Sequence, residues 1–173
     1  QTFSYGMDQR LPLICDVLLE LFTPASIVAR NESPLRTLEN LPLHKTVLYG
    51  EPYPTEINEG GLKYSVDLRQ GQKTGFFLDQ RENRAALSRY CKGARILDCF
   101  CNEGGFSLTG VRAGAREALG IDISGEAITR ARGNALLNRI ETVRFIEGDV
   151  MDTMKELFSG DEKFDIVVLD PPS

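Results

Sequence analysis

The sequence contains no tryptophan and a single histidine, and its four cysteines form no Cys-x-x-Cys pair. Without tryptophan, the chain lacks the largest aromatic platform on which a nucleic-acid base could stack. His44 and the scattered cysteines supply too few nitrogen and sulfur ligands for a zinc centre. We therefore expect no metal site.

Long apolar runs are also missing. No segment approaches the roughly 18–20 apolar residues of a membrane helix, and the first residues do not resemble a signal peptide. We predict a cytoplasmic protein with no membrane contact and with reduced thiols. The apolar stretch over 164–169 runs into prolines at the end of the sequence. We interpret it as a strand of a longer protein, whose unpaired edge invites self-association as a homodimer.

Acidic residues outnumber basic ones by 25 to 20, which argues against indiscriminate binding to nucleic acid. The basic residues are unevenly distributed, because the window from Arg69 to Arg95 holds seven of them against two acids. This local excess predicts contacts to phosphates. A solvated helix surface would show the same pattern.

Two regions of different pattern predict a domain boundary between residues 68 and 69. The first region, 1–68, predicts a small α+β domain. Its expected elements are a polar lead over 1–9, a helix over 10–22, a strand over 25–30, a helix or loop over 31–45, a strand over 46–49, and a hairpin that pairs 56–58 with 62–68.

The second region, 69–173, alternates helices with short apolar strands, which is typical of parallel βαβ units. The predicted strands are 95–99, 117–121, 143–146 and 164–169, and the predicted helices are 80–90, 104–113, 125–138 and 151–158. The fold class is therefore α/β, with a Rossmann-like parallel sheet behind the small α+β domain.

An aspartate lies at or just after the end of each predicted strand, and these residues are Asp98, Asp122, Asp149 and Asp170. In such sheets the ligand crevice lies outside the carboxyl ends of the strands, so we expect the four carboxylates to line one edge. The turn after Asp98 keeps only Gly104 and Gly105 of a pyrophosphate-binding glycine pattern. Negative charge at this edge favours a cationic or amine-bearing ligand over a phosphate.

The position of Asp122 suggests a nucleoside. It lies 24 residues after Asp98, at the distance at which an acid binds ribose hydroxyls in related sheets. Ile123 would then pack on the adenine face. Asp149 is either an acceptor for the adenine amine or only the N-cap of the next helix.

The Asp170-Pro171-Pro172 turn offers a carboxylate and no backbone N–H from its prolines. A rigid site of this kind suits a flat, amine-bearing base that has been pulled out of its stack.

Together the four acids and the glycine turn resemble motifs I to IV of the class I S-adenosylmethionine-dependent methyltransferases. The resemblance implies S-adenosylmethionine as cofactor, since this molecule carries a sulfonium and an ammonium and no phosphate. It also implies that Asp170 and Pro171 are catalytic residues that face the target base. The cofactor-binding residues that it implies are Phe77, Gln80, Asp98, Phe100, Cys101, Asn102, Gly104, Asp122, Ile123, Asp149 and Val150.

A closer resemblance lies in the segment from Val66 to Arg84, which includes Gly71-Gln72-Lys73-Thr74-Gly75-Phe76-Phe77-Leu78-Asp79-Gln80-Arg81. It is similar to the segment that leads into the catalytic domain of bacterial PUA-domain ribosomal RNA methyltransferases. That family acts on cytosine carbon 5 of large-subunit ribosomal RNA, so the resemblance implies ribosomal RNA as partner.

Two departures from that family leave alternatives open. The PUA domain and the cysteine nucleophile that follows motif IV are absent from this sequence, and Cys99 and Cys101 are interpreted as packing or pocket-wall residues. One alternative is a methyltransferase that acts on an exocyclic amine or a guanine nitrogen, which needs no thiol. The other is a non-catalytic module that binds RNA or the cofactor.

Overall fold

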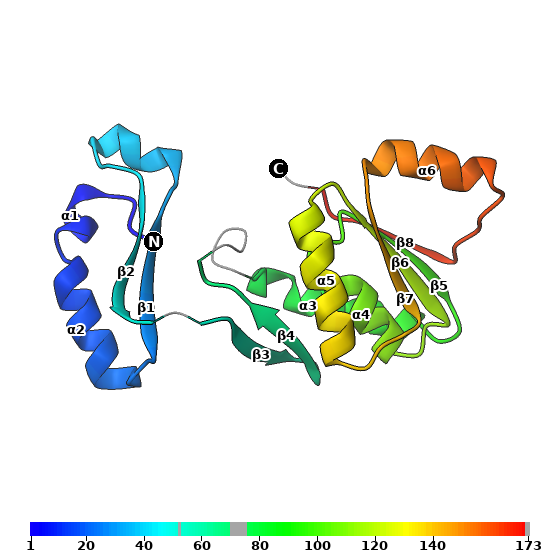
Figure 1. The fold of residues 1–173 in the computed structure, drawn as a ribbon, viewed down its shortest axis with the longest axis horizontal. Helices are drawn as coiled ribbons and strands as arrows, with labels where there is room; N and C mark the ends of the chain where they lie inside the picture. Colours follow the sequence, from blue (N-terminus) through cyan, green and yellow to red (C-terminus); the bar gives the residue numbers. More distant parts are fainter. Residues whose placement is uncertain (52, 70–75, 172–173) are drawn as a thin grey trace. The chain divides into compact units, whose positions relative to one another are not determined.

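The structure, a computed structural model, describes residues 1–51, 53–69 and 76–171. The chain forms two compact units (Figure 1). The smaller unit comprises Gln1–Thr55 and Val66–Phe77, and the larger unit comprises Glu56–Ser65 and Leu78–Ser173. No described helix has both the length and the apolar character needed to cross a membrane.

The smaller unit contains a two-stranded antiparallel sheet and short helices. Its elements are α1 (Tyr5–Asp8), α2 (Leu11–Phe22), β1 (Ser26–Asn31), η1 (Pro34–Glu39) and β2 (His44–Gly50). The predicted helix over 10–22 and the two predicted strands are confirmed. The predicted polar lead contains α1 instead, because Thr2 and Asp8 belong to a buried polar network.

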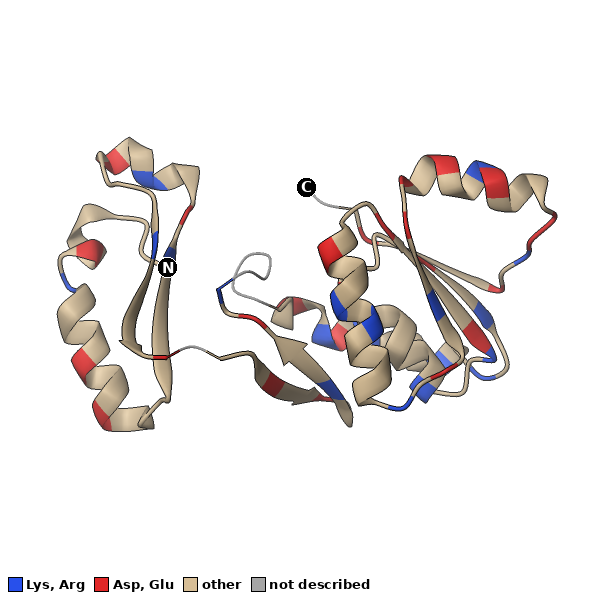
Figure 2. Cartoon of the chain, in the orientation of Figure 1, with Lys and Arg blue, Asp and Glu red and all other residues tan. Residues whose placement is uncertain are grey.

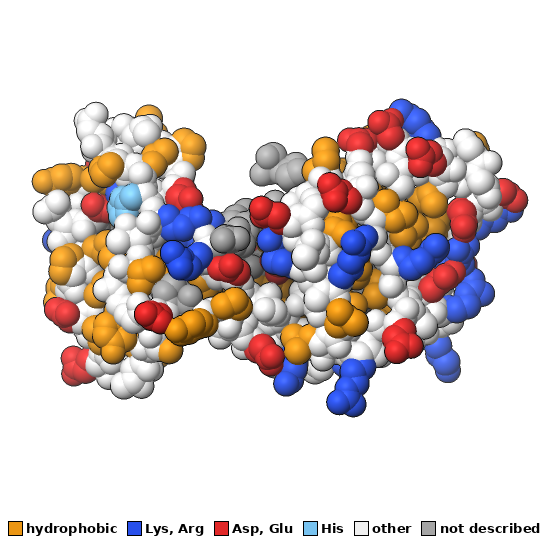
Figure 3. Space-filling model, in the orientation of Figure 1, with side chains coloured by type: hydrophobic (Ala, Val, Ile, Leu, Met, Phe, Trp, Pro, Cys, Tyr) orange, Lys and Arg blue, Asp and Glu red, His pale blue; other side chains and the backbone are white. Residues whose placement is uncertain are grey.

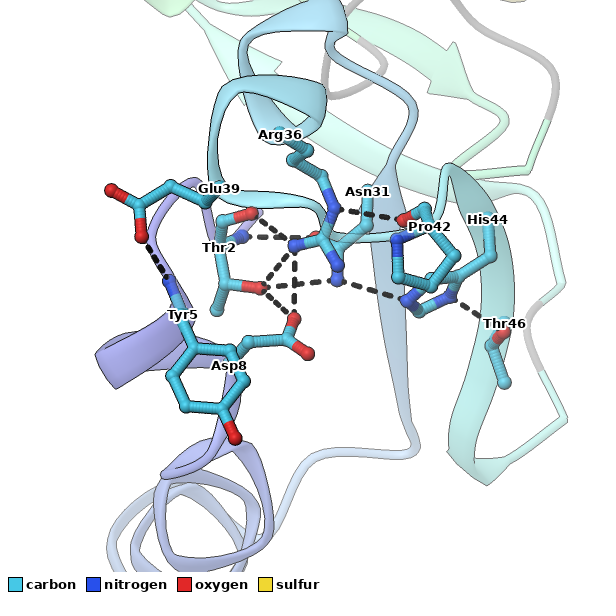
Figure 4. Close-up of polar contacts among 9 residues, drawn as sticks. All are labelled: Thr2, Tyr5, Asp8, Asn31, Arg36, Glu39, Pro42, His44 and Thr46. Carbon is cyan, nitrogen blue, oxygen red and sulfur yellow. Dashed lines mark hydrogen bonds and ion pairs between the residues drawn. The ribbon is translucent and has the colours of Figure 1, made fainter.

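That network surrounds the fully buried side chain of Arg36 (Figure 4). Its guanidinium forms an ion pair with Asp8 at 2.9 Å, and it donates to Thr2 Oγ1 at 2.9 Å and to the Pro42 carbonyl at 3.1 Å. Buried Asn31 accepts from the Thr2 backbone N–H at 2.9 Å. Paired polar groups therefore hold the amino-terminal residues against β1 and η1.

The larger unit is built on a four-stranded parallel sheet of order β7-β6-β5-β8. Its strands are β5 (Arg95–Cys99), β6 (Glu117–Asp122), β7 (Val143–Glu147) and β8 (Ile166–Leu169), and its helices are η2 (Leu78–Gln80), α3 (Arg81–Leu87), η3 (Ser88–Tyr90), α4 (Gly105–Arg112), α5 (Gly125–Leu137) and α6 (Val150–Ser159). Strands and helices alternate as predicted, and the strand order reverses beside β5.

Alternation along the strands places apolar side chains on both faces of this sheet. On one face, Leu97 and its neighbours pack against Val150 and other residues of α6. On the other face, Ile96 and Ala118 pack with Cys91 and with apolar residues of α3 and α4. Both faces are therefore covered, as expected for a parallel sheet.

A second two-stranded sheet, β3 (Thr55–Glu59) and β4 (Leu62–Val66), is attached to the larger unit. The amide oxygen of Asn138 accepts from the Lys63 N–H at 2.8 Å, and that of Asn134 accepts from the Ser65 N–H at 2.9 Å. Side chains of α5 thus bond to backbone groups of β4. This hairpin groups with the parallel sheet, which differs from the boundary predicted at residue 68.

Candidate functional site

The predicted aspartates lie at the carboxyl edge of the parallel sheet. Asp98 is in β5, Asp122 ends β6, Asp149 follows β7 and Asp170 follows β8. The negative charges of Asp170 and Asp122 both raise the pKa of Asp98, since each of them lies within electrostatic range of the Asp98 carboxyl group. In open parallel sheets, the point where the strand order reverses, here beside β5, is where a ligand crevice is expected.

Asp98 is buried, and only one of its two carboxylate oxygens has hydrogen-bond partners. Its Oδ2 accepts from the Ser107 N–H at 2.9 Å and from the Ser107 hydroxyl at 2.7 Å. Its Oδ1 is buried and has no hydrogen-bond partner among the described residues. Burial, followed by the charges of Asp170 and Asp122, raises the pKa of Asp98 to about 7 against the opposing bonds from Ser107. The edge therefore contains a carboxylate whose ionised form a nearby cation would stabilise.

The turn after β5 is held in left-handed conformations. Phe100, Asn102 and Gly104 have φ of 63°, 46° and 80°. The Asn102 N–H donates to Asp122 Oδ2 at 2.8 Å, and the Cys101 N–H donates to the Ile121 carbonyl at 2.9 Å. These bonds tie the turn to β6. The side-chain oxygen of Asn102 is buried and has no partner in the described structure.

Gly104 serves packing at the start of α4. A Cβ built there would lie 2.7 Å from Phe145 Cζ, and its φ of 80° disfavours any other residue. Phe100 is half-buried against the apolar cluster beneath α6. The side chain of Cys101 is buried as well. The turn therefore offers mainly backbone groups and the Asn102 side chain to a ligand.

Asp122 and Ile123 form the middle of the edge. Asp122 Oδ1 accepts from the Ser124 N–H at 2.9 Å, while its other oxygen accepts from Asn102. Each carboxylate oxygen has a second lone pair, so both remain able to accept from ribose hydroxyls. Ile123 is 71% exposed, which leaves an apolar surface beside this carboxylate.

Asp149 is the N-cap of α6, as one of the two interpretations predicted. Its Oδ1 accepts from the Met151 N–H at 2.9 Å and from the Asp152 N–H at 3.1 Å. The exposed residue also lines an open cavity of about 500 Å³ between the end of β7 and α6. Val150, by contrast, is buried in the core. The role of Asp149 toward adenine stays a prediction.

Asp170 and Pro171 are exposed beyond β8, and no ion pair or hydrogen bond of the Asp170 side chain is seen within the described residues. Gln80 is half-buried, and its side-chain oxygen accepts from Asn83 at 2.7 Å. Phe77 groups with the smaller unit, so its role at the edge also stays a prediction. Residues 70–75 and Pro172 lie outside the described residues.

Sequence reasoning missed the two serines that orient the carboxylates. Ser124 was detectable, because an Asp-x-Ser sequence before a helix is typical of an Asx turn followed by an N-cap. Its hydroxyl does accept from the Ala127 N–H at 3.3 Å. Ser107 gave no local signal, because only the packing of α4 against β5 brings it to Asp98.

The buried thiols of the larger unit are packing residues. Cys91, Cys99 and Cys101 are buried and unpaired, and burial raises the pKa of all three thiols. None is therefore activated as a thiolate. No cluster of three or more His, Cys, Asp or Glu side chains suited to a metal ion occurs in the described parts of the chain.

The basic window is only partly available to phosphates. Arg84 is buried and pairs with Glu59 at 2.6 Å. Arg95 pairs with Glu162 at 2.7 Å and also with Glu117. The guanidinium groups of Arg84 and Arg95 are already paired with carboxylates, and the phosphate contacts predicted for this window stay a prediction.

Three comparisons relate the chain to known proteins. A family model described as S-adenosylmethionine-dependent methyltransferase matches residues 43–173. The chain is 42% identical to the ribosomal RNA large subunit methyltransferase I of Aeromonas hydrophila over 99% of its length, and 39% identical to that of Tolumonas auensis over 99%. It covers 45% of each, so it spans less than half the length of these relatives.

A solved structure shares the fold. It is that of a protein provisionally named a methyltransferase, in complex with S-adenosylhomocysteine. The superposition has a TM-score of 0.80 at 24% identity and covers 100% of this chain and 44% of the other. This likeness confirms the predicted Rossmann-like α/β fold.

Proposed function

Because the chain belongs to the S-adenosylmethionine-dependent methyltransferase family, we propose that it binds S-adenosylmethionine at the carboxyl edge of its parallel sheet and serves to methylate a base of large-subunit ribosomal RNA. The relatives named above support this substrate. The observation that carries the proposal is the half-satisfied carboxylate of Asp98 in an edge where acidic acceptors predominate.

The residues at this edge fit the family's cofactor. S-adenosylmethionine bears positive charge on its sulfonium and ammonium and hydrogen-bond donors on its ribose and adenine, and when bound it supplies an electrophilic methyl group. Asp98 and the turn from Phe100 to Gly104 would hold the cationic methionine part. Asp122 would accept from the ribose, Ile123 would pack on adenine, and Asp149 would accept from its amine. Phe77 and Gln80 complete the proposed set, and the buried side chains of Cys101 and Val150 would support these residues from the core.

Asp170 and Pro171 are the proposed contacts to the target base. Asp170 presents an exposed carboxylate at the point where the strand order reverses. Pro171 has no backbone N–H and therefore does not donate to the acceptors at this turn. The Asp170 carboxylate stays available to the amine of a base. A base extruded from its stack could therefore be oriented by the Asp170 carboxylate.

Cytosine carbon 5 is the target atom that we propose. Its methylation would require a thiolate to add at carbon 6, so that carbon 5 becomes nucleophilic enough to take the methyl group from the sulfonium of the cofactor. Removal of the carbon-5 proton by a base would then expel the thiolate. The thiols of the larger unit are buried and have raised pKa values, so the nucleophile would be a different cysteine of the full-length protein. Nucleoside mass spectrometry of methylated RNA tests this, since N-methylated nucleosides would contradict it.

The cofactor site is tested by calorimetric titration with S-adenosylhomocysteine. We expect saturable binding that Asp122→Ala weakens about tenfold or more, because a hydrogen bond to a charged group is worth about 1.5–3 kcal/mol. Asp122→Asn, which keeps one acceptor oxygen, should lose less. Glu141→Ala removes an equal charge from the loop between α5 and β7 and should bind normally. Normal binding by Asp122→Ala would contradict the proposed site.

Affinity for S-adenosylmethionine should rise about tenfold between about pH 5.5 and pH 7. The pKa of Asp98 is raised to about 7, so its carboxylate is mostly protonated at the lower pH and ionises as the pH rises. A cationic ligand prefers the ionised form. The ligand's own α-amino group stays protonated over this range.

Two variants check the assignment of this pH dependence to Asp98. Asp98→Asn cannot ionise and should bind with nearly constant affinity across the range. Ser107→Ala removes a hydrogen bond that lowers the pKa of Asp98, so the rise in affinity should move to higher pH. A pH dependence that Asp98→Asn retains would assign it to another group.

A further inference from the structure

A group of cations with one aromatic residue lies at the opposite, amino edge of the parallel sheet. We call it the basic patch, and its exposed residues are Arg89, Tyr90, Lys92, Arg112 and Arg116. Figure 2 shows Lys and Arg segments concentrated where β5 and β6 begin, and Figure 3 shows blue side chains along this margin of the larger unit. None of these residues belongs to the proposed cofactor site.

Backbone hydrogen bonds make the basic patch one continuous surface. The Gly93 N–H donates to the Gly114 carbonyl at 2.8 Å, and the Arg116 N–H donates to the Ala94 carbonyl at 2.8 Å. A Cβ built on Gly114 would lie 3.8 Å from the Cα of Lys92. The segment before β5 and the segment between α4 and β6 therefore lie side by side, which brings Lys92 and Arg116 to the same edge of the larger unit.

These cations differ from the paired arginines of the larger unit, whereas Arg132, Arg139 and Arg144 likewise have no ion pair among the described residues. Arg84, Arg95 and Arg130 each pair with a carboxylate. No carboxylate lies within 4 Å of the four cations of the basic patch among the residues that the structure describes. Of the neighbouring acids, Glu117 pairs with Arg95, and Glu141 is exposed on the loop before β7. The patch thus concentrates positive charge on a chain of net charge −5.

Helix stability does not account for the whole basic patch. Arg112 lies in the last turn of α4, where a positive charge also interacts favourably with the helix dipole. Lys92 and Arg116 belong to connecting segments. Tyr90 is 72% exposed beside them, so its ring is available for a contact.

We propose that the basic patch binds single-stranded RNA, with its cations on phosphates and an unstacked base on Tyr90. Single strands are favoured over duplexes because only an unpaired base can stack on an exposed aromatic side chain. The inference rests on the proposed function, which makes RNA the substrate. The five-residue strand β5 separates the two edges by about 15 Å, so the patch would hold a segment of RNA away from the target base.

Fluorescence anisotropy with a short labelled single-stranded RNA of mixed sequence tests this proposal. Arg112→Ala/Arg116→Ala should weaken binding about tenfold and reduce the salt-dependence slope by about 1.4, which corresponds to two lost phosphate contacts. The control Lys155→Ala/Lys163→Ala makes the same charge change on and after α6 and should bind like the wild type. Equal binding by the patch variant, or no binding by the wild-type chain, would overturn the proposal.

Variants of Tyr90 distinguish binding of single-stranded RNA from general attraction to polyanions. Tyr90→Ala should weaken binding to the single strand about tenfold, and Tyr90→Phe should retain it, because stacking needs only the ring. Binding to a duplex of the same sequence should be insensitive to both variants. Equal sensitivity of single strand, duplex and heparin to the Arg variant, with none to Tyr90→Ala, would contradict a single-strand site.

The proposals for the basic patch and for the cofactor site are tested separately. Arg112→Ala/Arg116→Ala should bind S-adenosylhomocysteine normally, and Asp122→Ala should bind the labelled RNA normally. If Asp122→Ala keeps its affinity for S-adenosylhomocysteine, the proposed cofactor site is wrong while the patch stands. If the patch variant keeps its affinity for RNA, the patch is wrong while the cofactor site stands.

Discussion

Replacing Asp170 by alanine is expected to reduce the rate of methyl transfer to undermethylated large-subunit ribosomal RNA about 100-fold in the full-length protein. The carboxylate is exposed beyond β8, at the topological switch point beside β5, and we propose that it orients the target base. Loss of a positioning contact of this kind costs about 100-fold in rate. The measurement is the initial rate of transfer of a tritiated methyl group.

Three comparisons keep this prediction specific. Asp170→Asn retains one acceptor oxygen and should lose less activity than the alanine variant. Glu141→Ala removes an exposed acid from the loop before β7 and should leave the rate unchanged. Asp170→Ala should still bind S-adenosylhomocysteine. A wild-type rate for Asp170→Ala would show that another residue orients the base.

The same variant should shift the pH dependence of cofactor binding. The charge of Asp170 is one of the causes that raise the pKa of Asp98. Without that charge the Asp98 carboxylate ionises at lower pH, so the rise in affinity for S-adenosylmethionine should begin at lower pH. This readout distinguishes loss of a nearby charge from a general loss of structure.

Glu59→Ala should lower the free energy of unfolding of the larger unit by about 3–5 kcal/mol. The Glu59 carboxylate accepts from Arg84 Nε at 2.6 Å and from Nη2 at 3.0 Å, and both side chains are almost fully buried. Removing the acid leaves the guanidinium buried without this carboxylate. Denaturation followed by far-ultraviolet circular dichroism measures the change in a chain without tryptophan.

A matched variant on the same hairpin controls for the lost charge. Glu56 pairs with Lys63 at 3.4 Å, and both side chains are more than half exposed, so Glu56→Ala should change stability by less than about 1 kcal/mol. Glu59→Leu/Arg84→Met replaces the buried pair by apolar side chains and should recover most of the stability. A small effect of Glu59→Ala would mean that the pair does not attach the hairpin to α3.

The sequence by itself determined the order of elements and the chemistry of the edge. Strand and helix periodicities are local properties, so the alternation from residue 80 onward was readable without any tertiary contact. Carboxylates that follow strands must meet where parallel strands end, which is why Asp98, Asp122 and Asp170 were predicted together. The acidic character of these residues was also enough to favour a cationic cofactor over a phosphate.

Only the tertiary structure decided which groups these residues bond to. The hairpin groups with the sheet because Asn134 of α5 and Asn138, the C-cap of α5, bond to the backbone of β4, about 70 residues away in sequence. The pairing of Arg84 with Glu59 and of Asp98 with Ser107 also depends on segments that the fold brings together. Burial and pairing depend on contacts between distant segments, and residue type alone does not distinguish a solvated charge from one that must find a partner.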